Sequence, residues 1–383
     1  MKNWKRFLGI GTAAVMAVTA AVPALADDSF KIGMIGPLTG AAAIYGTAVR
    51  DAAQIAVDEI NEAGGVNGTM LEYNPQDDEH DPEKSVNAYN TLKDWGMQML
   101  LGSVTSSPCI AVEAEASGDN MFLLTPSGTA VDCITAGDNA FRVCFSDPAQ
   151  GAASAVFIGE HDLGKKVGIL YDSSDVYSSG IYATFRTEAA NQGFELPEEA
   201  ITTFTSDSKT DFSAQLQTLK DQGCDLVFLP FYYNEAAIVL KQAADMDYAP
   251  TWFGVDGMDG ILSMEGFDTS LAEGLMLLTP FSATAEDELT QNFVAKYQEL
   301  YKDIPNQFAA DAYDGVYIMK AALEKAGVTA DMDYSAVCDA MKTAMTEIQF
   351  EGITGDITWT ADGEPTKDPI AVVIKDGIYE IME

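Results

Sequence analysis

The segments GSVTSSPC (Gly102–Cys109) and LTPSGTA (Leu124–Ala130) decide the predicted fold. Each follows a short apolar run with the composition of a buried parallel strand. Each then places Ser, Thr or Gly at the position where a helix is expected to begin. In the first segment, the hydroxyl of Ser106 precedes Pro108, a residue favoured in the first helical turn. Both segments therefore predict a strand, a tight turn and a helix.

The hydroxyl groups of these two segments have two interpretations. A helix N-terminus offers unpaired N–H groups and a partial positive charge, so it can hold a carboxylate or a phosphate. Ser and Thr at such positions can also serve only as helix caps. The local sequence leaves both interpretations open, and the rest of the chain has to distinguish them.

Strand-like and helix-like segments alternate along the first part of the chain. We expect strands over 30–36 and 70–74 and helices over 47–63 and 82–95, the last capped by Asp81. Together with the two segments above, this alternation predicts a mostly parallel sheet with helices on both faces.

The same alternation starts again at KKVGIL (165–170), which predicts a second α/β domain. Further on, the pattern predicts helices over 286–302, 306–326 and 334–346, and then strands over 353–360 and 370–374. Because no Pro/Gly/Ser-rich linker separates the halves, we expect the chain to pass between them through several short connections. The predicted fold class is therefore α/β with two lobes.

Residues 1–26 have the three parts of a secretory signal peptide. A basic start (Lys2, Lys5, Arg6) precedes an apolar centre over 7–18 and the small-residue cleavage site ALA (24–26). No later run approaches the ~20 apolar residues that a membrane span needs. We therefore expect a soluble exported protein, either periplasmic or otherwise extracytoplasmic.

The charge and the cysteines restrict the possible partners. The chain has 59 acidic against 21 basic residues, a net charge of −38, so it should repel nucleic acid and anionic membrane surfaces. Its five cysteines form no CxxC or zinc-type spacing. Cys133 and Cys144 flank a loop and are the expected disulfide pair, with five buried thiols as the alternative.

Ligands of open α/β sheets bind beyond the carboxyl ends of the strands, which singles out the residues after each predicted strand. These residues are 37–45, 105–107 and 127–129 in the first half, and 171–177, 231–233 and 256–259 in the second. The first half contributes hydroxyls and helix N-termini, whereas the second contributes tyrosines and Asp256. An anion-binding side that faces a cation-binding side, with aromatic walls, suits a zwitterion with an apolar tail.

The sequence offers no catalytic motif. Its two histidines, His80 and His161, have no nucleophile nearby in the sequence, and neither GxSxG, HExxH nor a GxGxxG after the first strand occurs. The acidic cluster at Asp77–Asp81 lacks the spacing of an EF-hand. We therefore expect a protein that is not an enzyme and uses no cofactor or metal.

Several segments together carry a resemblance to a known family. They are KIGMIGPLTG (31–40), INEAGGVNG (60–68), DDEHDPEKSVNAYNTL (77–92) and the two hydroxyl segments. In these segments the chain resembles the type I periplasmic binding proteins of ABC transporters, above all the Leu/Ile/Val-binding group. The resemblance implies two lobes joined by three hinge crossings. Its implied lobes are residues 27–144 with 278–352, and residues 145–277 with 353–383.

The resemblance also implies a set of ligand contacts. Ser106 and Thr129 would hold an α-carboxylate, while Asp256 and the carbonyl of Ser127 would take an α-ammonium group. The other implied contacts are Tyr45, Tyr177 and Tyr232, which would line the cleft, and Thr105 at its edge. Relatives often have Glu in place of Asp256, and some have a disulfide where this chain has His80 and Thr105.

The implied function is that of a monomeric extracytoplasmic receptor. It would capture a branched-chain L-amino acid by hinge closure and deliver it to a membrane permease. The alternative within the same fold is a receptor for another small ligand, such as an amide, urea or an aromatic acid. A secreted hydrolase and the ectodomain of a sensory receptor are the alternatives from other classes. Asp256 distinguishes the first two interpretations. An amino acid needs a partner for its ammonium group, whereas a simple carboxylic acid has no such group and gains nothing from Asp256.

Overall fold

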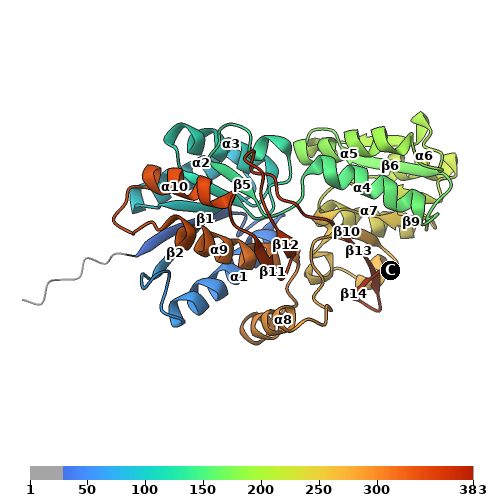
Figure 1. Cartoon of the computed structure of the whole chain (residues 1–383). Coiled ribbons are helices and arrows are strands. Elements are labelled where there is room, and N and C mark those ends of the chain that lie inside the picture. Colours follow the sequence, from blue (N-terminus) through green and yellow to red (C-terminus); the bar gives the residue numbers. More distant parts are fainter. Residues whose placement is uncertain (1–28, 383) are drawn as a thin grey trace, which may run out of the picture.

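The structure, a computed structural model, describes residues 29–382. The segments of one lobe come from the first third of the chain together with helices α9 and α10, shown in blue to cyan and orange to red in Figure 1. The other lobe contains the middle of the chain, in green and yellow, and the C-terminal strands. The predicted signal peptide, 1–26, lies outside the described residues.

The first lobe is built on a parallel sheet in the order β2-β1-β3-β4-β5. Its strands are β1 (Phe30–Gly36), β2 (Leu71–Asp77), β3 (Met99–Gly102), β4 (Phe122–Thr125) and β5 (Ala140–Arg142). Helices α1 (Ala43–Glu62), α2 (Pro82–Trp95) and α3 (Ser106–Asp119) connect the first four strands. The predicted alternation is confirmed from β1 to β4. The helix expected at Leu124–Ala130 is wrong, because β4 leads through a loop and the short helix η1 (Val131–Cys133) directly to β5.

Helix α2 illustrates why the local sequence determines these elements. The carboxylate of Asp81 accepts the backbone N–H of Lys84 at 2.9 Å, and Pro82 follows it in the first turn. The helix ends at Gly96, whose φ of 91° is left-handed and unfavourable for other residues. Both boundaries of the predicted helix 82–95 are therefore confirmed.

The second lobe is built on a seven-stranded sheet in the order β14-β13-β10-β9-β8-β6-β7. Strands β6 (Val167–Asp172), β7 (Ile201–Phe204), β8 (Leu226–Phe228), β9 (Thr251–Phe253) and β10 (Met276–Thr279) pair in parallel. Strands β13 (Ile370–Lys375) and β14 (Ile378–Ile381) add an antiparallel edge. The helices of this lobe are α4 (Asp147–Glu160), α5 (Val176–Ala189), α6 (Ser213–Gln222) and α7 (Tyr233–Asp245).

The C-terminal third returns to the first lobe before it ends in the second. Its helices are α8 (Glu288–Tyr301), α9 (Gln307–Ala326) and α10 (Tyr334–Met345), and α9 packs against α1 and α10. The single strand predicted over 353–360 is wrong, because β11 (Phe350–Gly352) and β12 (Gly355–Ile357) form a hairpin. The carboxylate of Asp314 accepts the N–H groups of Ile353 and Thr354 at 3.1 and 2.9 Å, which holds the turn.

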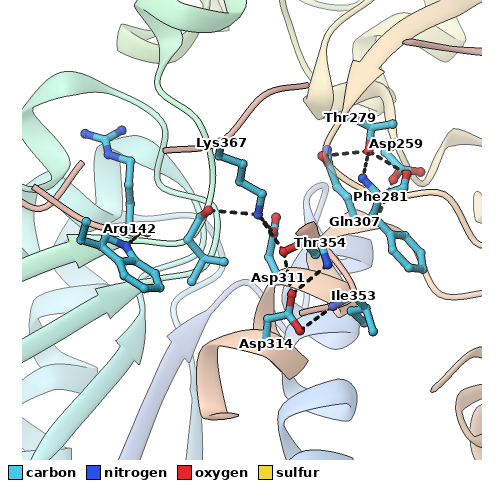
Figure 2. Close-up of polar contacts among 12 residues, drawn as sticks. Arg142, Asp259, Thr279, Phe281, Gln307, Asp311, Asp314, Ile353, Thr354 and Lys367 are labelled. Atoms are coloured by element: carbon cyan, nitrogen blue, oxygen red, sulfur yellow. Dashed lines mark hydrogen bonds and ion pairs between the residues drawn. The ribbon is translucent and has the colours of Figure 1, made fainter. Parts of the chain in front are cut away.

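A buried ion pair joins the segments that cross between the lobes. The ammonium group of Lys367 lies 2.7 Å from the carboxylate of Asp311 in α9, and both side chains are at most 2% exposed (Figure 2). The same ammonium group donates to the Val143 carbonyl at 3.0 Å and to the Thr354 hydroxyl at 2.9 Å. Because these contacts hold Lys367 against the first lobe, we expect the chain to cross to the second lobe after this residue. The lobe boundary at residue 352 that the resemblance implies stays a prediction.

The expected Cys133–Cys144 disulfide is wrong. Cys133 and Cys144 are both buried free thiols, as are the other three cysteines of the described chain. Cys133 belongs to the short helix η1 (Val131–Cys133), and its sulfur contacts the carbonyl oxygen of Ser106 in α3. Cys133 therefore faces α3, whereas Cys144 lies in the segment that follows β5.

Candidate functional site

The first hydroxyl loop connects β3 with α3. Thr105 occupies the N-cap position of α3, yet its side chain makes no capping hydrogen bond. Its hydroxyl instead lies 2.8 Å from Nδ1 of His80. The hydroxyl of Ser106 accepts the backbone N–H of Ala130 at 3.2 Å, which links this loop to the next one. The interpretation that these hydroxyls only cap the helix is therefore wrong for this loop.

The second hydroxyl loop follows β4 and is held from behind by a buried arginine. The guanidinium group of Arg142, which is fully buried, donates to the carbonyls of Gly128, Thr129 and Ala130 at 3.1, 2.6 and 3.0 Å. The hydroxyl of Ser127 donates to the carbonyl of Val104 at 2.7 Å. In contrast, the buried hydroxyl of Thr129 makes no hydrogen bond to these loops. It lies beside the buried carboxyl group of Asp147, whose pKa it lowers against the larger effect of burial.

A carboxylate of the second lobe faces these loops. Asp256 follows β9 and is 4% exposed, and its Oδ1 accepts the hydroxyl of Tyr177 at 2.6 Å and the amide of Gln150 at 2.8 Å. The Gln150 side chain also accepts the backbone N–H of Asp256 at 2.6 Å. Burial raises the pKa of Asp256 to about 6, although the hydrogen bonds from Tyr177 and Gln150 oppose this shift.

The backbone of Asp256 is fixed as firmly as its side chain. The amide of Gln307, the first residue of α9, donates to the Asp256 carbonyl at 2.6 Å. The backbone N–H of Gln307 donates to the carboxylate of Asp259 at 2.8 Å, and its side-chain oxygen accepts the Thr279 hydroxyl at 3.2 Å (Figure 2). The start of α9 therefore anchors the loop that carries Asp256 to the end of β10.

Aromatic rings fill the space between the hydroxyl loops and Asp256. The rings of Tyr177 and Tyr232 stack with centroids 4.7 Å apart and planes at 3°. The ring of Tyr45 lies 4.2 Å from that of Phe308, between centroids, and its hydroxyl donates to the carbonyl of Gly257 in the other lobe. The Tyr45 hydroxyl thus connects the two lobes directly.

The eight residues that the sequence predicts for the site surround one cavity of about 220 Å³. They are Tyr45, Thr105, Ser106, Ser127, Thr129, Tyr177, Tyr232 and Asp256, and the remaining lining residues are Val104, Gly257 and Phe308. The space left between these side chains is about that of one water molecule, so a ligand requires the rings or the lobes to move apart.

Sequence reasoning missed four residues of this site: Gln150, Arg142, Gln307 and Phe308. Phe308 follows no strand, and the other three act through side chains that reach back from neighbouring elements. The sequence offered one signal for these residues: Arg142 stands within the apolar run AFRVCF (140–145). An Arg in such a run is expected to be buried, and a buried guanidinium group needs several hydrogen-bond acceptors.

His80 lies beside the cavity without a catalytic arrangement. Its ring meets that of Tyr232 edge-on, with centroids 5.5 Å apart, and burial lowers the pKa of His80 to about 4. The neighbouring acids serve the backbone: Asp77 accepts the N–H of Leu38 at 2.8 Å, and Asp81 caps α2. Within residues 29–382, no group of three His, Cys, Asp or Glu side chains is arranged to hold a metal ion.

A second and larger hollow, of about 840 Å³ including open solvent, lies away from these residues. It is bounded by α8, the loop before α9 and the turn before β14, including Val294, Ile304 and Ile378. Its lining comes mainly from exposed or apolar groups, whereas the smaller cavity brings buried polar groups of both lobes together. The smaller cavity is therefore the candidate site.

Comparison with known proteins agrees with this architecture. The chain is 32% identical to the Leu/Ile/Val-binding protein BraC3 of Rhizobium johnstonii, over 91% of this chain and 94% of the relative. It is 28% identical to the leucine-, isoleucine-, valine-, threonine- and alanine-binding protein of Pseudomonas aeruginosa, over 92% and 91% of the two chains.

A solved structure gives the same result for the fold. The branched-chain amino acid transporter substrate binding protein LivJ of Streptococcus pneumoniae, in complex with isoleucine, matches with a TM-score of 0.83 and 28% identity. The match covers 92% of this chain and 99% of that one. In the part of the chain that the structure describes, no helix has the length and apolar character to cross a membrane. Residues 29–377 match the family model described as periplasmic binding protein, and the chain belongs to this family.

Proposed function

We propose that this protein is the extracytoplasmic receptor of an ABC importer and captures a branched-chain L-amino acid in the cavity between its lobes. The observation that carries the proposal is the pairing of Asp256 on one wall with the hydroxyls of Ser106 and Thr129 on the other. The two relatives above are named as binding proteins for leucine, isoleucine and valine, and LivJ is in complex with isoleucine.

The two polar walls suit the two ends of an amino acid. The α-carboxylate would meet the hydroxyls of Ser106 and Thr129 and the N-terminus of α3, where backbone N–H groups favour an anion. The α-ammonium group would lie against the carboxylate of Asp256 and the carbonyl of Ser127. The buried hydroxyl of Thr129 supports this assignment, because it lines the cavity and a hydroxyl can donate a hydrogen bond to a carboxylate.

The side chain of the ligand would lie among the rings of Tyr45, Tyr177, Tyr232 and Phe308. These rings offer apolar faces to an aliphatic side chain. Thr105 would stand at the edge of the cavity. Asp256 is shorter than glutamate by one methylene group, so the ammonium group would lie closer to the second lobe than it would with glutamate, or a water would bridge the gap.

The same geometry supports capture by closure of the two lobes. The ligand would bridge the hydroxyl loops and Asp256 only when the lobes are closed, so its binding energy favours the closed state. The Tyr45 hydroxyl, bound to the Gly257 carbonyl, would add a direct contact to that state. The closed form would then be recognised by a membrane permease. We propose that the protein acts as a monomer and catalyses no reaction.

A calorimetric titration of ligand-stripped mature protein tests the proposal. We expect Leu, Ile or Val to bind with a Kd of about 1 μM or lower, equivalent to about −8 kcal/mol. Asp256→Ala should weaken binding by at least about 100-fold, since it removes the partner of a buried charge. The matched control is Glu265→Gln, an exposed acid of the same lobe. Tight binding of an amide, urea or benzoate, and none of amino acids, would refute the amino-acid assignment.

A further inference from the structure

Two cysteines lie directly behind the hydroxyl loops. Cys109 is in the first turn of α3, Cys133 ends η1, and both side chains are fully buried. The sulfur of Cys109 lies 3.8 Å from the carbonyl oxygen of Cys133, and the sulfur of Cys133 lies 3.6 Å from that of Ser106. Each thiol therefore reaches toward the loop that carries the other.

Both thiols also face the same glycine, Gly128. The pKa of the Cys133 thiol is raised by burial and, further, by its hydrogen bond with the thiol of Cys109. A Cβ atom placed on Gly128 would lie 3.0 Å from the sulfur of Cys109 and 3.2 Å from that of Cys133. Both sulfurs therefore lie over the same glycine, whose lack of a side chain leaves them room.

The other three cysteines of the described chain lie elsewhere. Cys144 follows β5, Cys224 packs near Gly168 in the second lobe, and Cys338 lies in α10. Cys109 and Cys133 are thus the pair that the fold brings together. A disulfide demands close sulfurs and compatible backbone positions, and α3 packs against η1.

We propose that Cys109 and Cys133 form a disulfide once the protein is in an oxidising compartment, with a low-molecular-weight disulfide such as oxidised glutathione as the oxidant. The thiolate of one cysteine attacks a glutathione sulfur, and one glutathione leaves as a thiol. The second cysteine then attacks the mixed disulfide and releases the second glutathione. Two protein thiols lose two electrons and two protons, and one glutathione disulfide becomes two thiols.

The bond would connect the two loops that form one wall of the cavity. Ser106 lies three residues before Cys109 in α3, and Thr129 lies in the loop that leads to Cys133. A covalent link restricts these loops to fewer arrangements, which lowers the entropy lost on binding. This consequence rests on the proposed amino-acid function: reduction should then raise the Kd for leucine by about 2- to 10-fold.

The pairing is tested by mass spectrometry on mature protein exported to an oxidising periplasm. The protein is unfolded in urea that contains iodoacetamide, which alkylates every free thiol. It is then cleaved after Lys, Arg and Glu. Glu113 separates Cys109 from Cys133, and Arg142 separates Cys133 from Cys144, so every pairing has its own mass. We expect a fragment that links Cys109 to Cys133 and disappears after reduction. Alkylation of both cysteines, or a link between Cys133 and Cys144, would overturn the proposal.

Two single variants make the assignment specific. Cys109→Ser should leave Cys133 free to be alkylated, whereas Cys144→Ser, at an equally buried position, should retain the linked fragment. A linked Cys133 in the Cys109→Ser variant would contradict the pairing. Because the mass does not depend on any ligand, this result stands apart from the proposed function. If the disulfide forms but its reduction leaves the Kd for leucine unchanged, the pairing stands. The inferred effect of the disulfide on the cavity wall is then wrong.

Discussion

The hydroxyl of Tyr177 donates a 2.6 Å hydrogen bond to Oδ1 of Asp256, and it accepts the backbone N–H of Gly257 at 2.9 Å. Tyr177 lies at the start of α5 and Asp256 follows β9, so this contact fixes the carboxylate between two elements of one lobe. The stacked ring of Tyr232 covers the other side of Tyr177. These contacts within one lobe hold the carboxylate of Asp256 in the second wall of the cavity.

Tyr177→Phe removes this hydroxyl and keeps the stacked ring. We expect the Kd for the amino acid to rise about 10-fold or more, because a hydrogen bond to a charged group is worth about 1.5–3 kcal/mol. Calorimetric titration measures the change. Tyr171→Phe is the control, since Tyr171 stacks on Tyr182 outside the cavity, with centroids 4.0 Å apart. Equal affinities for Tyr177→Phe and the unmodified protein would show that the hydroxyl does not position Asp256.

Binding should depend on pH through Asp256. Its pKa is raised to about 6 by burial, and an ammonium group prefers the ionised carboxylate. The affinity for an amino acid should therefore be constant above about pH 7 and fall about tenfold per unit at pH well below 6. Titrations between about pH 4.5 and 8 would show this change. A flat profile in that range would contradict the role of Asp256 as the ammonium partner.

The same shift predicts how the ligand-free protein responds to pH. The pKa of Asp256 is higher in the folded than in the unfolded state, so the folded state binds more protons between about pH 4 and 6. Asp256 therefore lowers the free energy of unfolding as pH rises through this window. Asp256→Asn should become more stable relative to the unmodified protein from pH 4 to 7, as urea unfolding would report. A pH-independent difference would mean that the pKa of Asp256 is not raised.

Much of this fold could be predicted because its signals are local. The cap of α2 at Asp81, the glycine that ends it and the apolar runs of β1, β3 and β4 lie within short stretches of sequence. The eight expected site residues line one cavity because parallel strands carry their following loops to the same edge of a sheet.

The remaining features depend on contacts between distant parts of the chain. The turn between β11 and β12 is held by Asp314, and Gln307 reaches Asp256 from the start of α9, so neither has a signal in its own segment. The expected partner of Cys133 was wrong for a related reason. Cys144 is closer to Cys133 in sequence, but α3 packs against η1 and brings Cys109 to it instead.

Thr129→Val separates the binding role of a hydroxyl from its role in stability. Since the contact of this hydroxyl with the Asp147 carboxyl is its one polar contact among the described residues, a methyl group in its place should lower the free energy of unfolding by at most about 1 kcal/mol. The Kd for the amino acid should rise about 10-fold through loss of a hydrogen bond to the carboxylate. Urea unfolding and calorimetry measure the two effects on the same sample.

Ser127→Ala is the comparison for this variant. The hydroxyl of Ser127 donates to the carbonyl of Val104 at 2.7 Å, so its loss should cost about 1 kcal/mol of stability. Its proposed ligand contact is the backbone carbonyl, which the substitution retains. A larger loss of stability in Thr129→Val than in Ser127→Ala, together with unchanged binding, would show that the Thr129 hydroxyl has a structural role and does not face the ligand.

Lys367→Met tests the ion pair at the lobe crossings. The substitution leaves the carboxylate of Asp311 buried without its cation, which should lower the free energy of unfolding by about 3–5 kcal/mol. Urea unfolding measures the change. Lys375→Met is the control, because Lys375 pairs with Glu380 at the surface, 3.0 Å apart, and such pairs contribute about 0–1 kcal/mol.

The double variant Lys367→Met/Asp311→Asn identifies the cause of the loss. If the cost comes from the unpaired buried charge, the neutral amide should recover a large part of the stability lost in Lys367→Met. If the cost comes from the bonds of Lys367 to the Val143 carbonyl and the Thr354 hydroxyl, the double variant should be no more stable than the single one. The second outcome would mean that Lys367 stabilises the crossing through these neutral acceptors and that its charge pairing with Asp311 contributes little.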